Sequence, residues 1–395
     1  MAERWLQVAV SIGSSSLLTS TCVAAMPITR RQTLQWASSL LLGASPFASS
    51  TATPASAAAS SPGERAGQLS LFAGQIQLHG HTDGPVGKAT FFDPRGLAVD
   101  PRNGDIILAD AANALIRRIT PAGEVSTLAG GAEDRVNKDG PALQARFVGP
   151  DALAVALDGT IYIADSYANT IRVLRNGEVS TLAGQVGRQG YADGQGTAAQ
   201  FNHPVGIAVD PRTGDVLVAD AYNNTLRRIS PKGRVRTIGG QPGVNDHRDG
   251  LLKQALFNTP VGIAVAPDGT IYVSEFFNQD VRKITPQGMV GTLAGNPAKR
   301  GDTDGRGVAA LFRKPQQLCL DAHGNIILAD GGNHKVRRIT PAGEVTTLAG
   351  QGQLDKVELG PLPGALITPY GVAPGPQGSV LVSSGEAVLR ITQAA

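Results

Sequence analysis

The run PRGLAVD at residues 94–100 opens a pattern that recurs through most of this chain. It continues as IILAD at 106–110, IRRI at 116–119 and VSTLAG at 125–130. These short runs are rich in β-branched and apolar residues, and turn-forming pairs such as Asn103-Gly104 separate them. Such a succession is typical of four β-strands that form an antiparallel meander.

The pattern occurs six times, and a proline marks the start of each copy. Successive prolines are 54 to 56 residues apart: Pro94, Pro150, Pro204, Pro260, Pro315 and Pro369. A nearly constant period indicates one structural unit per copy, and such units bury their apolar faces by packing against their neighbours. Four-stranded units in a radial array make a β-propeller.

The last copy, which runs from Pro369 to Thr392, ends before a fourth strand. The run LSLFAG at 69–74 matches the TLAG strands of the other copies and supplies the missing strand. We therefore predict an all-β fold, a six-bladed β-propeller of four-stranded antiparallel blades whose sixth blade is closed by an N-terminal strand. Closure of this kind leaves no blade edge exposed.

Composition agrees with many short strands joined by turns, because the 395 residues include 49 Gly and 25 Pro. The formal net charge is +3, and Arg4, Arg30 and Arg31 against Glu3 account for two of these charges. The nearly neutral remainder excludes a strongly basic nucleic-acid-binding domain. Of the two cysteines, only Cys319 lies outside the N-terminal region, so we expect a core residue and no intramolecular disulfide.

The amino terminus has the layout of an export signal. Arg30-Arg31 precede an apolar run at 38–44, and Ala55-Ser56-Ala57 offers the small residues that a signal peptidase reads. The apolar run is too short to span a bilayer, which takes about 20 residues. We expect cleavage after Ala57 and a periplasmic or secreted protein without a membrane span. A disordered tail over residues 1–65 is the alternative interpretation.

The predicted organisation has three parts. Residues 1–57 are a presequence and export signal, within which Met26 is the alternative translation start, 58–65 are a linker, and 66–394 are the propeller. The arginine pair resembles the twin-arginine signal, although Thr33 and Gln35 depart from its preferred aromatic residue and lysine.

The motifs PxGIAVD, VADxxN and IRRI, over roughly residues 66–394, resemble the NHL-repeat family of propellers. The resemblance implies the six-bladed fold. It does not select one function, because similar propellers serve as sensor domains, interaction scaffolds, RNA-binding modules and a few enzymes.

Residues that recur in nearly every copy are interpreted as scaffold, because a catalytic group is needed only once. The second strand ends in an acid in five copies, and each third strand carries an arginine: Asp110, Asp165, Asp220, Glu275 and Asp330, with Arg117, Arg172, Arg227, Arg282, Arg337 and Arg390. The turn between these strands holds Asn113, Asn169, Asn223, Asn278 or Asn333, which we expect to accept backbone N–H groups and to tolerate a left-handed backbone. Recurring Asp-Gly pairs in the linkers are interpreted as turns before a short helical turn, with calcium binding as the alternative.

Function is sought where the copies differ, at the mouth where the first strands begin and the turns after the second strands meet. The residue after each proline is polar on one side of the ring and apolar on the other, and aromatic residues cluster two positions after the strand acid in copies two to four. Such a mouth suits a sugar or peptide ligand. The candidate ligand-binding residues are Arg95, Asp151, Gln316, Tyr370, Tyr167, Tyr222 and Phe277.

We therefore expect a monomeric, non-enzymatic binding propeller that recognises a protein, peptide or glycan, with no cofactor, no metal and no nucleic-acid partner. The alternative is a metal-dependent propeller enzyme, either a lyase or a lactonase. The lyases that these repeats resemble hold zinc by a His after the anchor proline, and no copy has one there. The six histidines are scattered, only His203 lies near the mouth, and Asp151 alone does not make the ligand set of a lactonase.

Overall fold

The computed structural model describes residues 67–394 except 133 and 353–355. The export signal, cleavage site and linker predicted over residues 1–65 lie outside the described residues. No helix in the described part of the chain is long and apolar enough to span a membrane.

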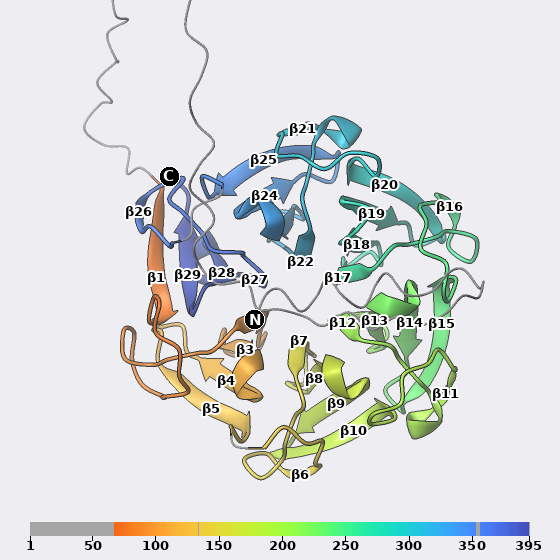
Figure 1. Cartoon of the computed structure of the whole chain (residues 1–395), viewed down its shortest axis with the longest axis horizontal. Helices are drawn as coiled ribbons and strands as arrows, with labels where there is room; N and C mark the ends of the chain where they lie inside the picture. The colour runs from red at the N-terminus through yellow and green to blue at the C-terminus, as the bar shows by residue number, and fades with distance from the viewer. Residues whose placement is uncertain (1–66, 133, 353–355, 395) are drawn as a thin grey trace, which may run out of the picture. The chain divides into compact units, whose positions relative to one another are not determined.

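Six antiparallel sheets form the ring that the repeat predicts (Figure 1). Within a blade the strands are named A to D from the central channel outward. Blade one contains β2 (Pro94–Val99), β3 (Ile106–Asp110), β4 (Leu115–Ile119) and β5 (Val125–Gly130). Blade two contains β7 (Pro150–Val155), β8 (Ile161–Asp165), β9 (Thr170–Arg175) and β10 (Glu178–Gly184). Blade three contains β12 (Pro204–Val209), β13 (Val216–Asp220), β14 (Thr225–Ile229) and β15 (Arg234–Gly240).

The second half of the ring repeats this order. Blade four contains β17 (Pro260–Val265), β18 (Ile271–Glu275), β19 (Asp280–Ile284) and β20 (Met289–Gly295). Blade five contains β22 (Pro315–Leu320), β23 (Ile326–Asp330), β24 (Lys335–Ile339) and β25 (Glu344–Ala349). Blade six contains β27 (Val372–Pro374), β28 (Val380–Ser384), β29 (Ala387–Thr392) and β1 (Gln68–Gly74).

The sixth blade is closed as predicted. Strand β1 pairs antiparallel with β29, with Leu69 opposite Ile391, so the first and last strands of the propeller lie side by side (Figure 1). Leu69 and Phe72 are 1% and 2% exposed, and both belong to the apolar core on either side of this blade. Closure therefore combines ladder hydrogen bonds with apolar burial.

The expectation of four strands per blade is incomplete, because five of the six described sheets have a fifth, two-residue strand at the outer edge. These strands are β6 (Gly140–Pro141), β11 (Gly194–Gln195), β16 (Gly250–Leu251), β21 (Gly305–Arg306) and β26 (Gly360–Pro361). Each linker runs along strand D of the blade that it enters, as Gly194 opposite Val235 shows. In blade one this contact is a single bridge between Gly84 and Val125.

Most of the described linkers lack the short helical turn that the sequence predicted. Only two described linkers contain one, η4 (Gly196–Ala198) and η6 (Gly307–Ala309), and Ala142-Leu143 form a plain turn. The B–C turns of blades one, two, three and five contain η2 (Ala111–Asn113), η3 (Ser166–Ala168), η5 (Ala221–Asn223) and η7 (Gly331–Asn333), and the A–B turn of blade six contains η8 (Pro376–Gly378).

Candidate functional site

The recurring acid–arginine pair is a buried structural element. In blade three, Arg227 Nη1 lies 2.6 Å from Asp220 Oδ2, and both side chains are fully buried. The same guanidinium lies 2.8 Å from Asp193 Oδ1 and 5.0 Å from the centre of the Phe201 ring. Blades one, two, four and five repeat this pair, so the scaffold interpretation is confirmed.

The linker aspartates are engaged by protein donors. Asp193 Oδ2 accepts the backbone N–H of Thr237 at 3.0 Å, and Oδ1 accepts its hydroxyl at 3.0 Å. Since Arg227 also binds this carboxylate, the Asp-Gly linkers fasten strand D and the buried arginine together. This arrangement supports the turn interpretation rather than the calcium alternative.

The asparagines of the B–C turns do not all act as expected. Asn223 donates its amide to Asp220 Oδ2 at 2.8 Å and to the Gly190 carbonyl at 2.7 Å, and Asn113 and Asn333 donate in the same way. The left-handed residue is the next one, Asn224, with φ of 57°. Asn278 likewise donates to Glu275 Oε1 at 3.0 Å. For Asn113, Asn223, Asn278 and Asn333 the predicted acceptor role was therefore wrong, because the strand acid beside them needs a donor. Asn169, one position further on, is left-handed and accepts a backbone N–H as predicted.

The polar side of the mouth is an internally bonded network. Arg95 Nη1 lies 2.8 Å from Asp151 Oδ2, and its guanidinium also lies 2.9 Å from Asp93. Tyr370 donates its hydroxyl to the other oxygen of Asp151 and stacks below Arg95, with 5.2 Å from the guanidinium carbon to the ring centre. Asp151 is 1% exposed, and burial raises the pKa of Tyr370 well above its usual value, with the Asp151 charge adding to the rise.

Aromatic side chains form a shelf next to this network. The Tyr167 and Tyr222 rings lie 5.1 and 4.7 Å from the His203 ring, which stands between them. We call these three residues the aromatic shelf. Tyr167 and Tyr222 are 46% and 47% exposed. Burial raises the pKa of Tyr167 while the nearby positive charge of Arg95 opposes the rise, so the shelf adjoins the polar network.

The two remaining candidates lie on the next blades. Phe277 is 56% exposed and packs edge-to-face on Phe276 at 4.9 Å between ring centres. Gln316 is partly buried, and its carbonyl accepts the Ser274 hydroxyl at 2.5 Å. Burial lowers the pKa of His203, the histidine placed near the mouth from sequence, which keeps its imidazole neutral within the shelf.

The central channel below the mouth is nearly filled. It leaves a cavity of about 50 Å³ whose lining includes Leu97, Leu153, Ile207, Ile263 and Gln317. A Cβ atom on Gly206 would lie 2.4 Å from the Val261 carbonyl oxygen, so strand A of blade three touches strand A of blade four.

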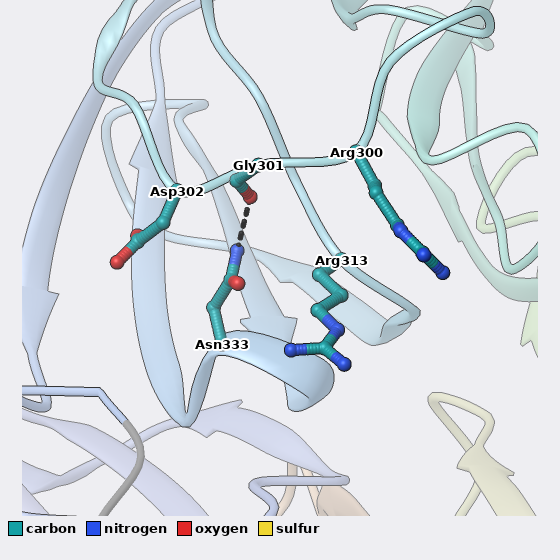
Figure 2. A pocket seen from close by; sticks show the side chains of 5 residues that line it. All are labelled: Arg300, Gly301, Asp302, Arg313 and Asn333. Carbon is teal, nitrogen blue, oxygen red and sulfur yellow. Dashed lines mark hydrogen bonds between the residues drawn. The ribbon is translucent and has the colours of Figure 1, made fainter. Parts of the chain in front are cut away.

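Sequence reasoning missed a pocket of about 360 Å³ beside blade five (Figure 2). Arg300 and Arg313 line it together with Gly301, Asp302 and Asn333, and Asn333 donates to the Gly301 carbonyl at 2.6 Å. Arg300 lies in the linker that enters blade five, and Arg313 directly precedes Lys314. Both positions vary between copies, so a comparison of the copies could have revealed the pocket.

Sequence reasoning also treated every histidine as isolated, which is wrong for His247. One ligand atom from each of His247, Glu275 and Asp280 lies within 4.8 Å of the others. The sequence did contain a sign of this cluster. In the fourth copy, Glu275 replaces the aspartate that ends strand B, and Asp280 is the first residue of strand C.

Comparisons with known proteins agree with this architecture. The family described as NHL repeat matches residues 201–229, which span strands A to C of blade three. The chain is 28% identical over 275 residues to the Arabidopsis thaliana protein SUPPRESSOR OF QUENCHING 1, chloroplastic, covering 66% of this chain and 26% of that protein. It is 28% identical over 152 residues to human NHL repeat-containing protein 2, covering 35% of this chain and 21% of that protein. The chain thus spans about a quarter or less of the length of these two relatives.

Two solved propellers illustrate the breadth of the fold. An auxiliary nutrient binding protein from Bacteroides thetaiotaomicron is similar with a TM-score of 0.64 and 16% identity, over 83% of this chain and 76% of that one. A gluconolactonase from Xanthomonas campestris is similar with a TM-score of 0.53 and 14% identity, over 83% and 90%. At such identities the likeness shows the fold alone. The chain thus contains an NHL repeat at residues 201–229, is similar to NHL-containing proteins and forms a six-bladed ring.

Proposed function

We propose that this protein is an exported, non-enzymatic binding propeller that holds a peptide, protein or glycan at the mouth of its central channel. The observation that carries the proposal is the aromatic shelf, in which two half-exposed tyrosines from neighbouring blades flank His203. Phenol rings offer an apolar face and a polar hydroxyl, a combination that suits sugar rings and peptide side chains.

The polar network beside the shelf supports binding rather than turnover. Asp151 is buried between Arg95 and Tyr370, so its charge is already compensated. Such a network holds the rim of the mouth in one geometry, and a pre-organised site loses little conformational entropy when a ligand binds.

The enzyme alternative has less support. A lactonase-like or lyase-like site would place acids or histidines around an ion in the channel. Within the part of the chain that the structure describes, the channel cavity is lined by apolar residues and glycines apart from Gln317 and Cys319. The burial that raises the pKa of the Cys319 thiol also disfavours a thiolate there.

Export is proposed on the sequence of the amino terminus, namely the Arg30-Arg31 pair, the apolar run and the Ala55-Ser56-Ala57 site. Changing both arginines to lysine should stop export if the twin-arginine route is used. Normal export of this variant, followed by detection of mature protein in the periplasm or medium, would assign the chain to the general secretory route instead.

Binding can be tested by calorimetry with a panel of oligosaccharides and cell-wall stem peptides. The double variant Y167A/Y222A should weaken binding about tenfold or more, since each aromatic contact contributes roughly 0.5–1.5 kcal/mol. The control is Tyr191→Ala, which removes a tyrosine that is 64% exposed in a linker outside the shelf. Equal loss in both variants, or no binding by the unaltered protein, would contradict the proposal.

A further inference from the structure

Blade four departs from the repeat at three positions that converge in space. Glu275 ends its strand B, Asp280 begins its strand C, and His247 lies in the linker that enters the blade. The Nε2 atom of His247 is 3.0 Å from Asp280 Oδ2, and ligand atoms of all three residues lie within 4.8 Å of one another.

The equivalent positions in other blades show what is unusual here. In blade two they are Asn137 and Thr170, joined by a hydrogen bond of 3.2 Å. In blade five they are Asp302 and Lys335, joined by an ion pair of 2.8 Å. These positions therefore connect the linker to strand C in all three blades. In blade four both side chains are of metal-ligating types, and a second carboxylate stands beside them.

The carboxylate of Asp280 is buried beside two other acids, Glu275 and Asp249. Its side chain is fully buried, and neither oxygen accepts a hydrogen bond from any described residue. The positive charge of Arg282 acts on Asp280 but is shared, because Glu275 at 2.6 Å and Asp249 also bind its guanidinium. Blade three has two carboxyl groups around the equivalent Arg227, whereas blade four has three around Arg282.

The two side chains that connect the linker to strand C in blade four face each other directly. His247 Nε2 lies 3.0 Å from Asp280 Oδ2 and 3.0 Å from Thr292 Oγ1. A neutral imidazole has one N–H and one lone pair, so in one tautomer it donates to the Asp280 carboxylate and in the other it presents its lone pair, beside that carboxylate, to a cation.

We propose that His247, Glu275 and Asp280 form a binding site for one divalent transition-metal ion, for which Zn²⁺ is the best match. One imidazole and two carboxylates suit Zn²⁺ and its neighbours in the first row, whereas Ca²⁺ requires about six to eight oxygen ligands. Within the described part of the chain, only Arg282 donates a hydrogen bond to Glu275 Oε2, which keeps a lone pair for the ion. His247 is 23% exposed and lies at the solvent side, which provides an entry path.

The backbone between two of the ligands also differs from the other blades. The B–C turns of blades one, two, three and five contain 3-10 helices, whereas residues 276–279 form a wider turn closed by Gln279 N–H on the Glu275 carbonyl at 3.0 Å. Ligand atoms around tetrahedral zinc stand about 3.4 Å apart, so the cluster closes on an ion by a movement of about 1 Å. The ion would clip the linker to the turn that carries Phe277. This inference does not depend on the proposed binding function.

The test is calorimetric titration of the chelator-treated full chain with ZnCl₂, with Co²⁺ as a spectroscopic probe of the same site. We expect one ion per chain and a Co²⁺ d–d absorption band typical of a low-coordinate site. The variant H247N/D280T installs the Asn–Thr pair that occupies the equivalent positions in blade two, where the two side chains are joined by a hydrogen bond of 3.2 Å. It should fold and bind Zn²⁺ at least about 100-fold more weakly, since loss of outer-shell groups alone costs 10–100-fold.

His323→Gln is the matched control, because it removes an exposed histidine from a turn of blade five. It should leave the stoichiometry and affinity unchanged. If H247N/D280T fails to fold, the single variant H247N, which alters only a partly exposed side chain, carries the test. Absence of stoichiometric Zn²⁺ binding by the unaltered chain, or equal binding by the His247 variants, would overturn the proposal.

Discussion

Asn224, at the end of the B–C turn of blade three, accepts the backbone N–H of Thr259 from blade four at 2.8 Å. Asn169, Gln279 and His334 make the equivalent bond to the next blade at 2.8, 2.7 and 3.1 Å. Both partners are left-handed, with φ of 57° at Asn224 and 55° at Thr259. A positive φ at a β-branched residue costs of order 1–3 kcal/mol, so this bond helps to hold a strained backbone at the mouth.

Asn224→Ala should therefore lower the free energy of unfolding, because it removes the acceptor and places alanine in a left-handed conformation. The matched control is Asn176→Ala, at an exposed position with φ of 52° whose side chain makes no hydrogen bond to the described residues. We expect Asn224→Ala to cost about 1 kcal/mol more than the control in urea unfolding. Equal costs would mean that the bond between blades adds nothing.

Removal of the closing strand should destabilise the whole ring. A chain that begins at Ile76 lacks β1, whereas a control that begins at Gly67 retains it, and both lack residues 1–66. The shorter chain should lose several kcal/mol, since burial of Leu69 and Phe72 alone contributes about 1.5–3 kcal/mol each. Thermal unfolding measures the difference, and coincident melting curves would contradict closure by β1.

Gly206→Ala should be destabilising because the added Cβ would lie 2.4 Å from the Val261 carbonyl oxygen on the channel wall. Overpacking of this kind costs about 1–3 kcal/mol. Gly291→Ala is the control, because its Cβ would meet nothing within 4 Å and its strand favours alanine over glycine. If both variants unfold at the same denaturant concentration, the strands at the channel are less tightly packed than the structure indicates.

The buried Asp100 should make the free energy of unfolding depend on pH in the acidic range. Hydrogen bonds from Arg102, with Nη2 at 2.7 Å from Oδ2, hold the pKa of Asp100 below its usual value of 3.8. A depressed folded-state pKa contributes stability that is present above the unfolded value and lost as the pH falls through the folded one. The loss of stability caused by Arg102→Ala should therefore be full near pH 7 and shrink below about pH 4.

Urea unfolding between pH 3 and 7 checks this expectation. Arg236→Ala, at an exposed strand position, serves as the control and should show a pH-independent difference from the unaltered protein. A difference for Arg102→Ala that stays constant down to pH 3 would show that the guanidinium acts through packing and not through the carboxylate charge.

The six blades, their strand order and the closing N-terminal strand could be predicted from the sequence, because the same pattern of four strands recurs about every 55 residues. Residues that recur in nearly every copy, such as Asp220 and Arg227, could also be assigned a scaffold role from their repetition. The outer fifth strand escaped prediction, because two residues such as Gly194-Gln195 have no periodicity and pair only when the linker is held by Asp193.

At the mouth, the candidates could be found from differences between copies, but their relations could not. Sequence showed polar residues at Arg95, Asp151 and Tyr370, and only the closed ring brought them, 56 and 219 residues apart, into one bonded network. His247 and Asp280 are likewise 33 residues apart in the sequence, with β17 and β18 between them. The sequence by itself determined the architecture, because strand patterns and turns are local. The contents of the mouth and of the blade four cluster were decided by tertiary structure, because charge compensation and burial arise only where distant segments meet.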